Sequence, residues 1–301
     1  MVASLRELRE RNRSVRATQK ITRAMELIAA SRIAKAEQAA QAALPYTREL
    51  NRAVAAVAGN IDFSHPLTTE PAAIRRSAVL VVTSDRGLAG AYSSNVIREA
   101  ERLCQTLADA GRAVDLYVTG RKGLGYYTFR GRSLVQSWSG FSDKPTYAQS
   151  DAVAKTLIAA FRRPTDEGGV DEIQVVYTRF RSMLLQEVRP RRVLPLEVVE
   201  DVAGEHAAAP LYEFEPGGAA VLDALLDLYV RNRIHFYLMQ AAASELASKQ
   251  KAMKSATDNA QQLIEELTRQ ANQARQAKIT QEITEIVGGV QALTDAQSRN
   301  E

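Results

Sequence analysis

The 301-residue sequence has one cysteine, three histidines and no long apolar run, and these low counts exclude several classes of protein. Its single cysteine, Cys104, excludes an internal disulfide and any metal site built from several cysteines. The three histidines, His65, His206 and His235, are not at metal-ligand spacing, so we expect no metal site. No apolar run approaches the roughly 20 residues that a membrane span needs, and none near the N-terminus has signal-peptide length. We therefore expect a cytoplasmic chain without a transmembrane segment.

Helix-breaking residues are absent from two long blocks of the chain. Residues 1–44 contain neither proline nor glycine, and residues 219–287 also lack both. Aromatic residues make up only 6% of the chain whereas alanine occurs 48 times, which favours closely packed helices. We therefore predict two very long terminal helices. The first continues past Pro45 to about residue 58, and the second is roughly 100 Å long.

Small and apolar residues recur every seven positions in both blocks. The first series is Leu8, Val15, Thr22, Ala29, Ala36 and Ala43, flanked by Leu5, Ile21, Met25 and Ile28. The last series is Leu246, Met253, Ala260, Leu267 and Ala274, accompanied by Leu263, Ile264 and Ala271. This spacing is typical of coiled-coil seams with small side chains. It predicts an antiparallel pair of terminal helices in which the C-terminal helix is the longer.

The end of the second helix carries an apolar stripe for which this pairing leaves no partner: Ile279, Ile283, Ile286, Val287, Val290 and Leu293. An exposed stripe of this size most often marks an interface with another chain, the alternative being a tip folded back on its own chain.

Residues 1–44 are basic, with nine Lys or Arg against four Glu, although the net charge of the whole chain is only +4. Such a helix suits an acidic protein, a membrane surface or nucleic acid, or is simply a solvated face. Because no DNA- or RNA-binding motif accompanies it, nucleic acid is a weak alternative.

The middle of the chain alternates between strand-like and helix-like segments. The predicted strands cover residues 77–84, 113–119, 135–138, 172–179 and 182–199, and the predicted helices cover residues 95–110 and 147–161. Pro190 and Pro195 place the last strand at a sheet edge. We therefore predict a Rossmann-like three-layer α/β domain over residues 70–200, between an N-terminal shaft helix over residues 1–58 and a C-terminal shaft helix over residues 210–301.

Neither glycine-containing loop of this domain has a nucleotide-binding pattern. The segment 85–91 (DRGLAGA) lacks the Gly-x-Gly-x-x-Gly spacing, and Asp85 would repel a phosphate. The segment 120–125 (GRKGLG) is also out of register, so turn geometry and close backbone packing are the simpler interpretation of these glycines. No serine or cysteine has the context of a nucleophile. We therefore expect no cofactor and no catalytic activity in the chain itself.

Five stretches of the chain carry a resemblance to a known family. They are residues 18–30 (TQKITRAMELIAA), 84–88 (SDRGL), 212–216 (YEFEP), 252–260 (AMKSATDNA) and 274–289 (ARQAKITQEITEIVGG). In this order and spacing, the whole chain resembles the gamma subunits of F-type ATP synthases. The alternative from charge and periodicity alone is a coiled-coil adaptor or a basic nucleic-acid-binding protein.

The resemblance implies a non-catalytic central-stalk rotor. The paired terminal helices would pass along the axis of a ring of three alpha and three beta subunits, and the globular part would contact the epsilon subunit and the c ring. Proton flow would turn the c ring and the stalk together, which would couple rotation to ATP synthesis or hydrolysis at the beta subunits. The implied location is the cytoplasmic face of the cell membrane, as a peripheral protein.

The resemblance also implies contact residues at matching positions. Met25 would face the acidic lever of the beta subunit, with Arg23 and Lys20 meeting carboxylates beside it. A second set that would contact beta loops near the upper shaft consists of Arg275, Gln276, Thr280 and Glu282. Tyr212 and Glu213 fall in the segment placed against the c ring or epsilon. Lys249 stands near an arginine of the family, and its ion-pair partner is not evident from the sequence.

Overall fold

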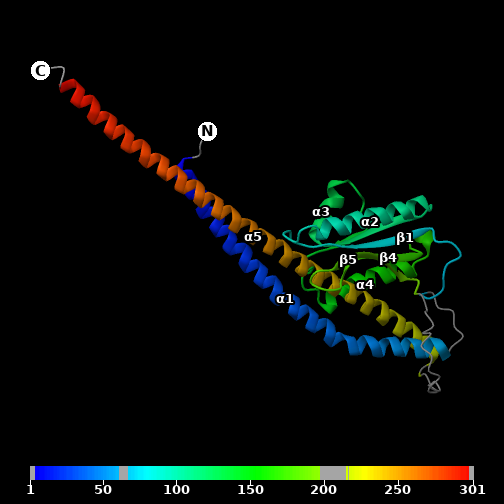
Figure 1. The fold of residues 1–301 in the computed structure, drawn as a ribbon. Coiled ribbons are helices and arrows are strands. Elements are labelled where there is room, and N and C mark those ends of the chain that lie inside the picture. The colour runs from blue at the N-terminus through cyan, green and yellow to red at the C-terminus, as the bar shows by residue number, and fades with distance from the viewer. Residues whose placement is uncertain (1–3, 61–66, 197–214, 216, 298–301) are drawn as a thin grey trace. The chain divides into compact units, whose positions relative to one another are not determined.

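A computed structural model describes residues 4–60, 67–196, 215 and 217–297 (Figure 1). The chain divides into two compact units, one made of residues 1–27 and 252–301 and the other of residues 28–251. We call them the helix-pair unit and the α/β unit. The two long helices are α1 (Leu5–Asn60) and α5 (Gly218–Gln297). Each of them is divided between the two units. The prediction that the first helix continues past Pro45 is confirmed, because Pro45 lies inside α1.

The α/β unit is built on a five-stranded sheet in the order β3-β2-β1-β4-β5. The strands are β1 (Arg76–Val82), β2 (Ala113–Thr119), β3 (Gln136–Trp138), β4 (Glu172–Phe180) and β5 (Gln186–Leu194). The first four are parallel to one another, and β5 pairs with β4 in the antiparallel sense. The carboxyl ends of β1, β2 and β3 therefore lie along one edge of the sheet, and the loops after them gather there.

Helices cover both faces of this sheet because its strands are apolar on both sides. In β1, Leu80 packs with residues of α4 (Tyr147–Arg162) and α5, whereas Val79 and Val81 pack with residues of α2 (Tyr92–Asp109) and α3 (Arg121–Phe129). Figure 1 shows α2 and α3 together on one side of the sheet and α4 on the other. A short 3₁₀ helix, η1 (Thr165–Glu167), follows α4. The predicted Rossmann-like three-layer arrangement is confirmed.

Two segments of the α/β unit differ from the sequence prediction. Residues 121–129 form helix α3, which was not predicted. The expectation of close backbone packing is confirmed at Gly123, where a Cβ would lie 2.8 Å from the Thr83 hydroxyl oxygen. The last strand is shorter than the predicted range 182–199. It begins at Gln186 because the Ser182 hydroxyl accepts hydrogen bonds from the backbone N–H groups of the turn before it. Pro190 lies in this edge strand opposite Val176, as the proline argument predicted.

The helix-pair unit joins the first part of α1 to the last part of α5. Polar bonds between the helices fix an antiparallel register: Asn12 donates to Thr268, Gln19 donates to Gln261, and the Thr22 and Thr257 hydroxyls lie 2.8 Å apart. The predicted seam is buried at Leu8, Thr22, Met253, Ala260, Ile264 and Leu267. The expectation that Ile21 flanks the seam is wrong, since its side chain is 60% exposed. A two-helix seam covers only one narrow stripe of each helix.

Candidate functional site

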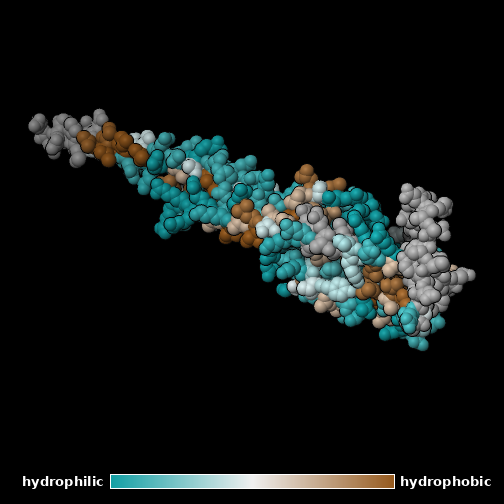
Figure 2. Space-filling view, turned by 90° about the horizontal axis from the view of Figure 1, so that it is seen from below, coloured by the Kyte–Doolittle hydropathy of each residue, from teal (hydrophilic) through white to brown (hydrophobic). Residues whose placement is uncertain are grey.

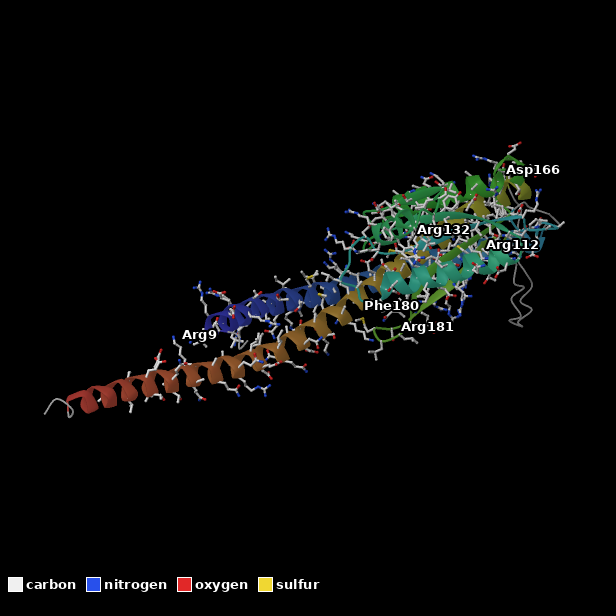
Figure 3. The ribbon with its side chains drawn as sticks, turned by 90° about the horizontal axis from the view of Figure 1, so that it is seen from above. Arg9, Arg112, Arg132, Asp166, Phe180 and Arg181 are labelled. Carbon is white, nitrogen blue, oxygen red and sulfur yellow. The ribbon has the colours of Figure 1, made fainter. Side chains whose placement is uncertain are left out.

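A groove between the two helices of the helix-pair unit is lined by cations. Its volume is about 550 Å³, and Arg9, Arg13, Arg16 and Lys20 of α1 face Thr268 and Asn272 of α5 across it. We call it the basic groove. These cations follow one another at helical spacings of three or four residues, which places them on one face of α1. Figure 3 shows Arg9 projecting from α1 at this end of the chain. The sequence showed the basic run but not the groove that it lines.

The first predicted contact set, Lys20, Arg23 and Met25, lies on α1 in the helix-pair unit. Lys20 and Arg23 are exposed and Met25 is half-buried. Arg23 already has a partner within the chain, because its guanidinium lies 2.9 Å from the carboxylate of the nearly buried Glu26. A carboxylate of another protein would therefore share Arg23 with Glu26, whereas Lys20 faces outward at the end of the basic groove.

The second predicted set lies on α5, and each of its members is exposed: Arg275, Gln276, Thr280 and Glu282. Glu282 forms a solvent-exposed ion pair with Lys278 at 3.6 Å. Such a pair contributes about 1 kcal/mol or less to stability, so it does not hold Glu282 back from a partner. All four side chains are exposed, so their positions fit contact with another molecule.

The structure does not bring the two predicted sets together. Gln19, beside Lys20, bonds to Gln261 of α5, and Arg275 follows Gln261 by 14 residues. At 1.5 Å per residue this is about 21 Å along the helix axis. The two predicted sets therefore lie at different positions along the helix pair, and their contacts with another molecule stay a prediction.

The apolar stripe on the last part of α5 is exposed along its described length. The exposed fractions are 48% for Ile279, 55% for Ile283, 66% for Ile286, 57% for Val287 and 59% for Val290. Figure 2 shows this end of α5 as a hydrophobic patch beside the grey residues. The Leu293 side chain lies outside the described side chains. In the described part of the helix-pair unit no residue of α1 reaches the stripe, which confirms that α5 is the longer helix.

Several predictions concern residues away from the helix pair. Tyr212 and Glu213 lie outside the described residues. Lys249 bonds to Glu245 at 3.1 Å, one helical turn away on α5, which supplies the partner that the sequence did not show.

Cys104 is buried, and burial raises the pKa of its thiol to about 11, as expected of a core cysteine. The His235 ring nitrogen Nδ1 lies 2.8 Å from the Ser150 hydroxyl, so this ring is packed rather than poised to bind a metal.

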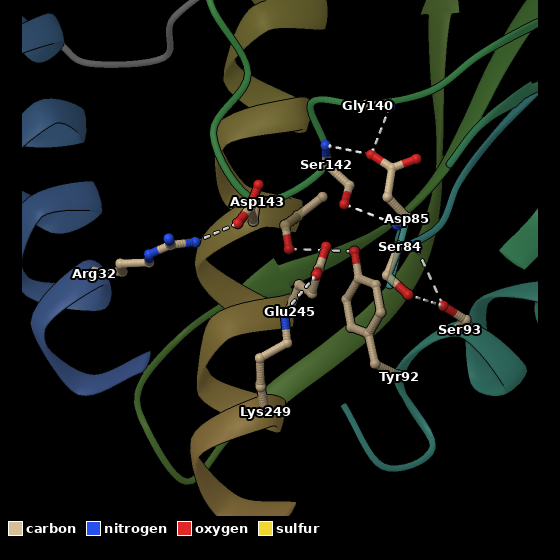
Figure 4. A network of polar contacts seen from close by, with 11 residues as sticks. Arg32, Ser84, Asp85, Tyr92, Ser93, Gly140, Ser142, Asp143, Glu245 and Lys249 are labelled. Atoms are coloured by element: carbon tan, nitrogen blue, oxygen red, sulfur yellow. Dashed lines mark hydrogen bonds and ion pairs between the residues drawn. The ribbon is translucent and has the colours of Figure 1, made fainter. Parts of the chain in front are cut away.

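Asp85, in the loop after β1, caps neighbouring loops. Its carboxylate accepts hydrogen bonds from the backbone N–H groups of Gly140 at 2.7 Å and Ser142 at 3.0 Å (Figure 4). It also accepts one from the backbone N–H of Arg121 at 3.2 Å. Burial alone would raise the pKa of Asp85, but these three donors together lower it below 3.8. Asp85 thus has a structural task, which is to hold the loops that contain Arg121, Gly140 and Ser142. Among the described residues no cluster of metal ligands exists, and no helix is long and apolar enough to cross a membrane.

Comparison with known proteins finds a family described as ATP synthase, which matches residues 4–293. A protein of Nocardioides sp. named ATP synthase gamma chain is 61% identical over the whole of both chains. A protein of the same name from Acidothermus cellulolyticus is 60% identical and covers 97% of this chain and 98% of its own length. A third, from Thermobifida fusca, is 54% identical over the full length of both.

Two solved structures are similar to the fold. One chain comes from the mitochondrial ATP synthase of Euglena gracilis, described as OSCP/F1/c-ring in rotational state 3. It has a TM-score of 0.70 and 17% identity, over 97% of this chain and 95% of its own. Another comes from the central stalk and c ring of the Tetrahymena thermophila mitochondrial ATP synthase, with a TM-score of 0.55 and 21% identity, over 78% of this chain and 99% of its own. At these identities the likeness concerns the fold.

Proposed function

This chain belongs to the gamma-chain family of ATP synthases, and on that premise we propose that it is the central-stalk rotor of a proton-translocating F-type enzyme. The helix pair would turn inside a ring of three alpha and three beta subunits, and the α/β unit would contact the epsilon subunit and the c ring. The chain itself would carry out no catalysis and need no cofactor. It would couple c-ring rotation to ATP synthesis or hydrolysis at the beta subunits, at the cytoplasmic face of the cell membrane.

The observation that carries this proposal is the exposed apolar stripe on α5. Five large aliphatic side chains between Ile279 and Val290 are each about half exposed or more. An isolated helix with such a stripe would associate with other molecules, so the stripe needs a covering partner. A hydrophobic sleeve formed by a surrounding ring of subunits supplies that cover without fixing the shaft at one angle.

The residue types of the two proposed contact zones support rotation rather than tight binding. Arg275, Gln276 and Thr280 present dispersed polar groups, and the basic groove presents several separate cations. A shaft that bound one beta subunit strongly would rest in a deep free-energy minimum at one angle, and each step would have to leave it. Weak, spread-out contacts of about 1 kcal/mol or less avoid such a minimum. We propose that Lys20, Arg23 and Met25 form one zone and that Arg275, Gln276, Thr280 and Glu282 form the other.

The contact proposal is tested with the double variant Arg275→Ala/Gln276→Ala. Both side chains are exposed, so the free energy of unfolding of the free variant chain should stay within about 0.5 kcal/mol of the wild-type value. In a complex reconstituted with alpha, beta, epsilon and c subunits, we expect proton-driven ATP synthesis to fall severalfold. The measurement is the synthesis rate at a fixed proton gradient, together with the amount of assembled complex.

The matched control is Arg102→Ala/Gln105→Ala, which removes the same residue types from helix α2 of the α/β unit. Both of these side chains are exposed and bond only to acidic residues of the same helix. The control complex should synthesise ATP at the wild-type rate. Equal synthesis rates in wild type, control and the Arg275/Gln276 variant would remove the second contact zone from the proposal.

A further inference from the structure

The α/β unit contains a second cavity that the rotor function does not use. Its volume is about 610 Å³, within the range of small-molecule sites. It is lined by the loops that follow β1, β2 and β3, and by α1 and α5. In open α/β sheets, the crevice outside the carboxyl ends of the parallel strands is the usual place for a ligand. We call it the strand-end cavity.

The lining of the strand-end cavity has an excess of positive charge. Its six cations are Arg32, Lys35, Arg86, Arg121, Lys144 and Lys249, and its three carboxylates are Asp85, Asp143 and Glu245. Each carboxylate already has donors in the chain (Figure 4). Asp85 accepts from three backbone N–H groups, and Asp143 is paired with Arg32 of α1.

The third carboxylate, Glu245, is neutralised inside the wall. Only 1% of its surface is exposed, and its Oε1 lies 3.1 Å from the Lys249 ammonium. Burial raises the pKa of Glu245, whereas Lys249 and the Ser142 hydroxyl act in the opposite direction. Glu245 and Lys249 therefore form an ion pair through Oε1 and add no net charge to the open part of the cavity, whereas the buried Oε2 of Glu245 has no hydrogen-bond partner among the described residues.

Three cations are left facing the cavity without a counter-ion. Lys35, Arg86 and Lys144 are exposed, and none of them forms an ion pair with a described residue. They come from α1, the loop after β1 and the loop after β3, so only the folded unit brings them to one cavity. Arg121 adds a fourth, more weakly engaged cation, since its Nε lies 3.9 Å from Asp85. Cations that converge from separate elements in a concave site attract a compact ligand of high negative charge.

We propose that the strand-end cavity binds a small multivalent oxyanion of the phosphate class, held by Lys35, Arg86 and Lys144. The ligand's oxygens accept hydrogen bonds from the two ammonium groups and from the guanidinium fork of Arg86. No aromatic ring belongs to the described lining on which a nucleotide base could stack. The recognised group is therefore the phosphate itself, and a nucleotide gains nothing from its base.

Binding is tested on the full chain by calorimetric titration with inorganic pyrophosphate, without divalent cations and at two salt concentrations. We expect saturable binding with one site per chain, weaker at the higher salt because exposed cations are screened. The variant Lys35→Gln/Arg86→Gln/Lys144→Gln should lose about tenfold or more in affinity, since each removed cation contributes about two- to threefold at an exposed position. ADP should bind no tighter than pyrophosphate.

The matched control is Arg9→Gln/Arg13→Gln/Arg16→Gln, which removes three positive charges from the basic groove of the helix-pair unit. This control should bind pyrophosphate within twofold of wild type. Equal weakening in both triple variants would show a general attraction between a basic protein and an anion, and would overturn the proposal. So would an absence of saturable binding to wild type, or a much tighter binding of ADP. The free chain suffices for the test, so the outcome does not depend on the rotor function.

Discussion

The helix-pair unit and the α/β unit contrast in how much side chain each one buries. In β1 of the α/β unit, every residue from Ala78 to Val82 is at most 3% exposed, with helices on both sides. In the helix-pair unit the seam is a single narrow line whose members include Ala260 and Thr22. Burial stabilises by about 25 cal/mol per Å² of apolar surface, so a seam of small residues gains little per turn. We therefore expect the α/β unit to be the more stable of the two, because α1 and α5 of the helix-pair unit contact each other only along one narrow seam.

The contrast shows what a thin seam allows. Because only one stripe of each helix is used for pairing, the other faces of α1 and α5 keep their cations and aliphatic side chains available. Ile21 and Leu27 of α1 are both more than half exposed, although each is a large hydrophobic residue. Dense packing like that of the α/β unit would have buried such groups. Low burial and availability to partners are two results of the same architecture.

The largest effect is expected from truncating one leucine in each unit. Leu80→Ala should lower the free energy of unfolding of the α/β unit by about 3 to 5 kcal/mol, because Leu80 is completely buried. Leu267→Ala should cost only about 2 kcal/mol, since a two-helix seam can close around the missing atoms. Urea denaturation followed by fluorescence of the only tryptophan, Trp138 of β3, reports on the α/β unit. Leu267→Ala should leave the transition at Trp138 nearly unchanged, because Leu267 lies in the helix-pair unit. A loss at Trp138 as large as that from Leu80→Ala would show that the two units unfold together and would contradict the contrast.

A smaller effect is expected at the loops of the α/β unit from Asp85→Asn. An amide has one acceptor oxygen where the carboxylate has two, so at least one of the three backbone donors loses its partner, at a cost of about 1 to 3 kcal/mol. Folding lowers the pKa of Asp85 below 3.8. The charged carboxylate therefore stabilises the fold fully above pH 3.8, and this stabilisation is lost as the pH falls through the pKa of Asp85 in the folded protein. The stability gap between wild type and variant, measured by urea denaturation, should therefore narrow below pH 3.8. A gap independent of pH would mean that the charge of Asp85 is not what matters.

The smallest effect is expected from the polar contact inside the seam. Thr22→Ala/Thr257→Ala removes the hydroxyl pair 2.8 Å apart and leaves two alanines in an alanine-rich seam. We expect a change of about 1 kcal/mol or less in the helix pair, because removing both partners of a hydrogen bond together leaves no unsatisfied group. Amide hydrogen exchange of the residues around Thr22 measures it. The control is the single variant Thr22→Ala, which removes only one of the two hydroxyls. A double variant whose helix pair is several kcal/mol less stable than that of wild type would show that the seam depends on polar pairing.

Much of the fold follows from local signals in the sequence. The strand predicted over residues 113–119 is β2 to the residue, because Gly111 and Gly120, at φ values of 75° and 93°, mark its two ends. The seven-residue series predicted the seam correctly at Leu8, Met253 and Leu267. These features depend on residues near one another in the chain, which is why periodicity and turn chemistry could find them.

Other features depend on contacts that the sequence does not order. Helix α3 was missed because Gly123 is required by the distant Thr83, whose hydroxyl accepts the Gly123 N–H at 2.9 Å. The strand-end cavity joins Lys35, Arg86 and Lys144, which meet there only because the strand order places the loops after β1 and β3 at one sheet edge and α1 lines the same cavity. The contact residues on α1 and α5 came from family resemblance, and their zones stay a prediction. Their separation along the helices became clear from the Gln19–Gln261 bond.

The antiparallel register also has a consequence for how the protein is made. Gln19 and its partner Gln261 are 242 residues apart in the chain. At a synthesis rate of about 5 to 20 residues per second, the N-terminal segment leaves the ribosome roughly 10 to 50 s before its mate exists. The α/β unit also needs α5 as far as Lys251, so it is completed only shortly before Gln261 is made. The seam at Leu8 can close only after the last part of α5 has been synthesised, so the helix pair is the last part of the fold to form.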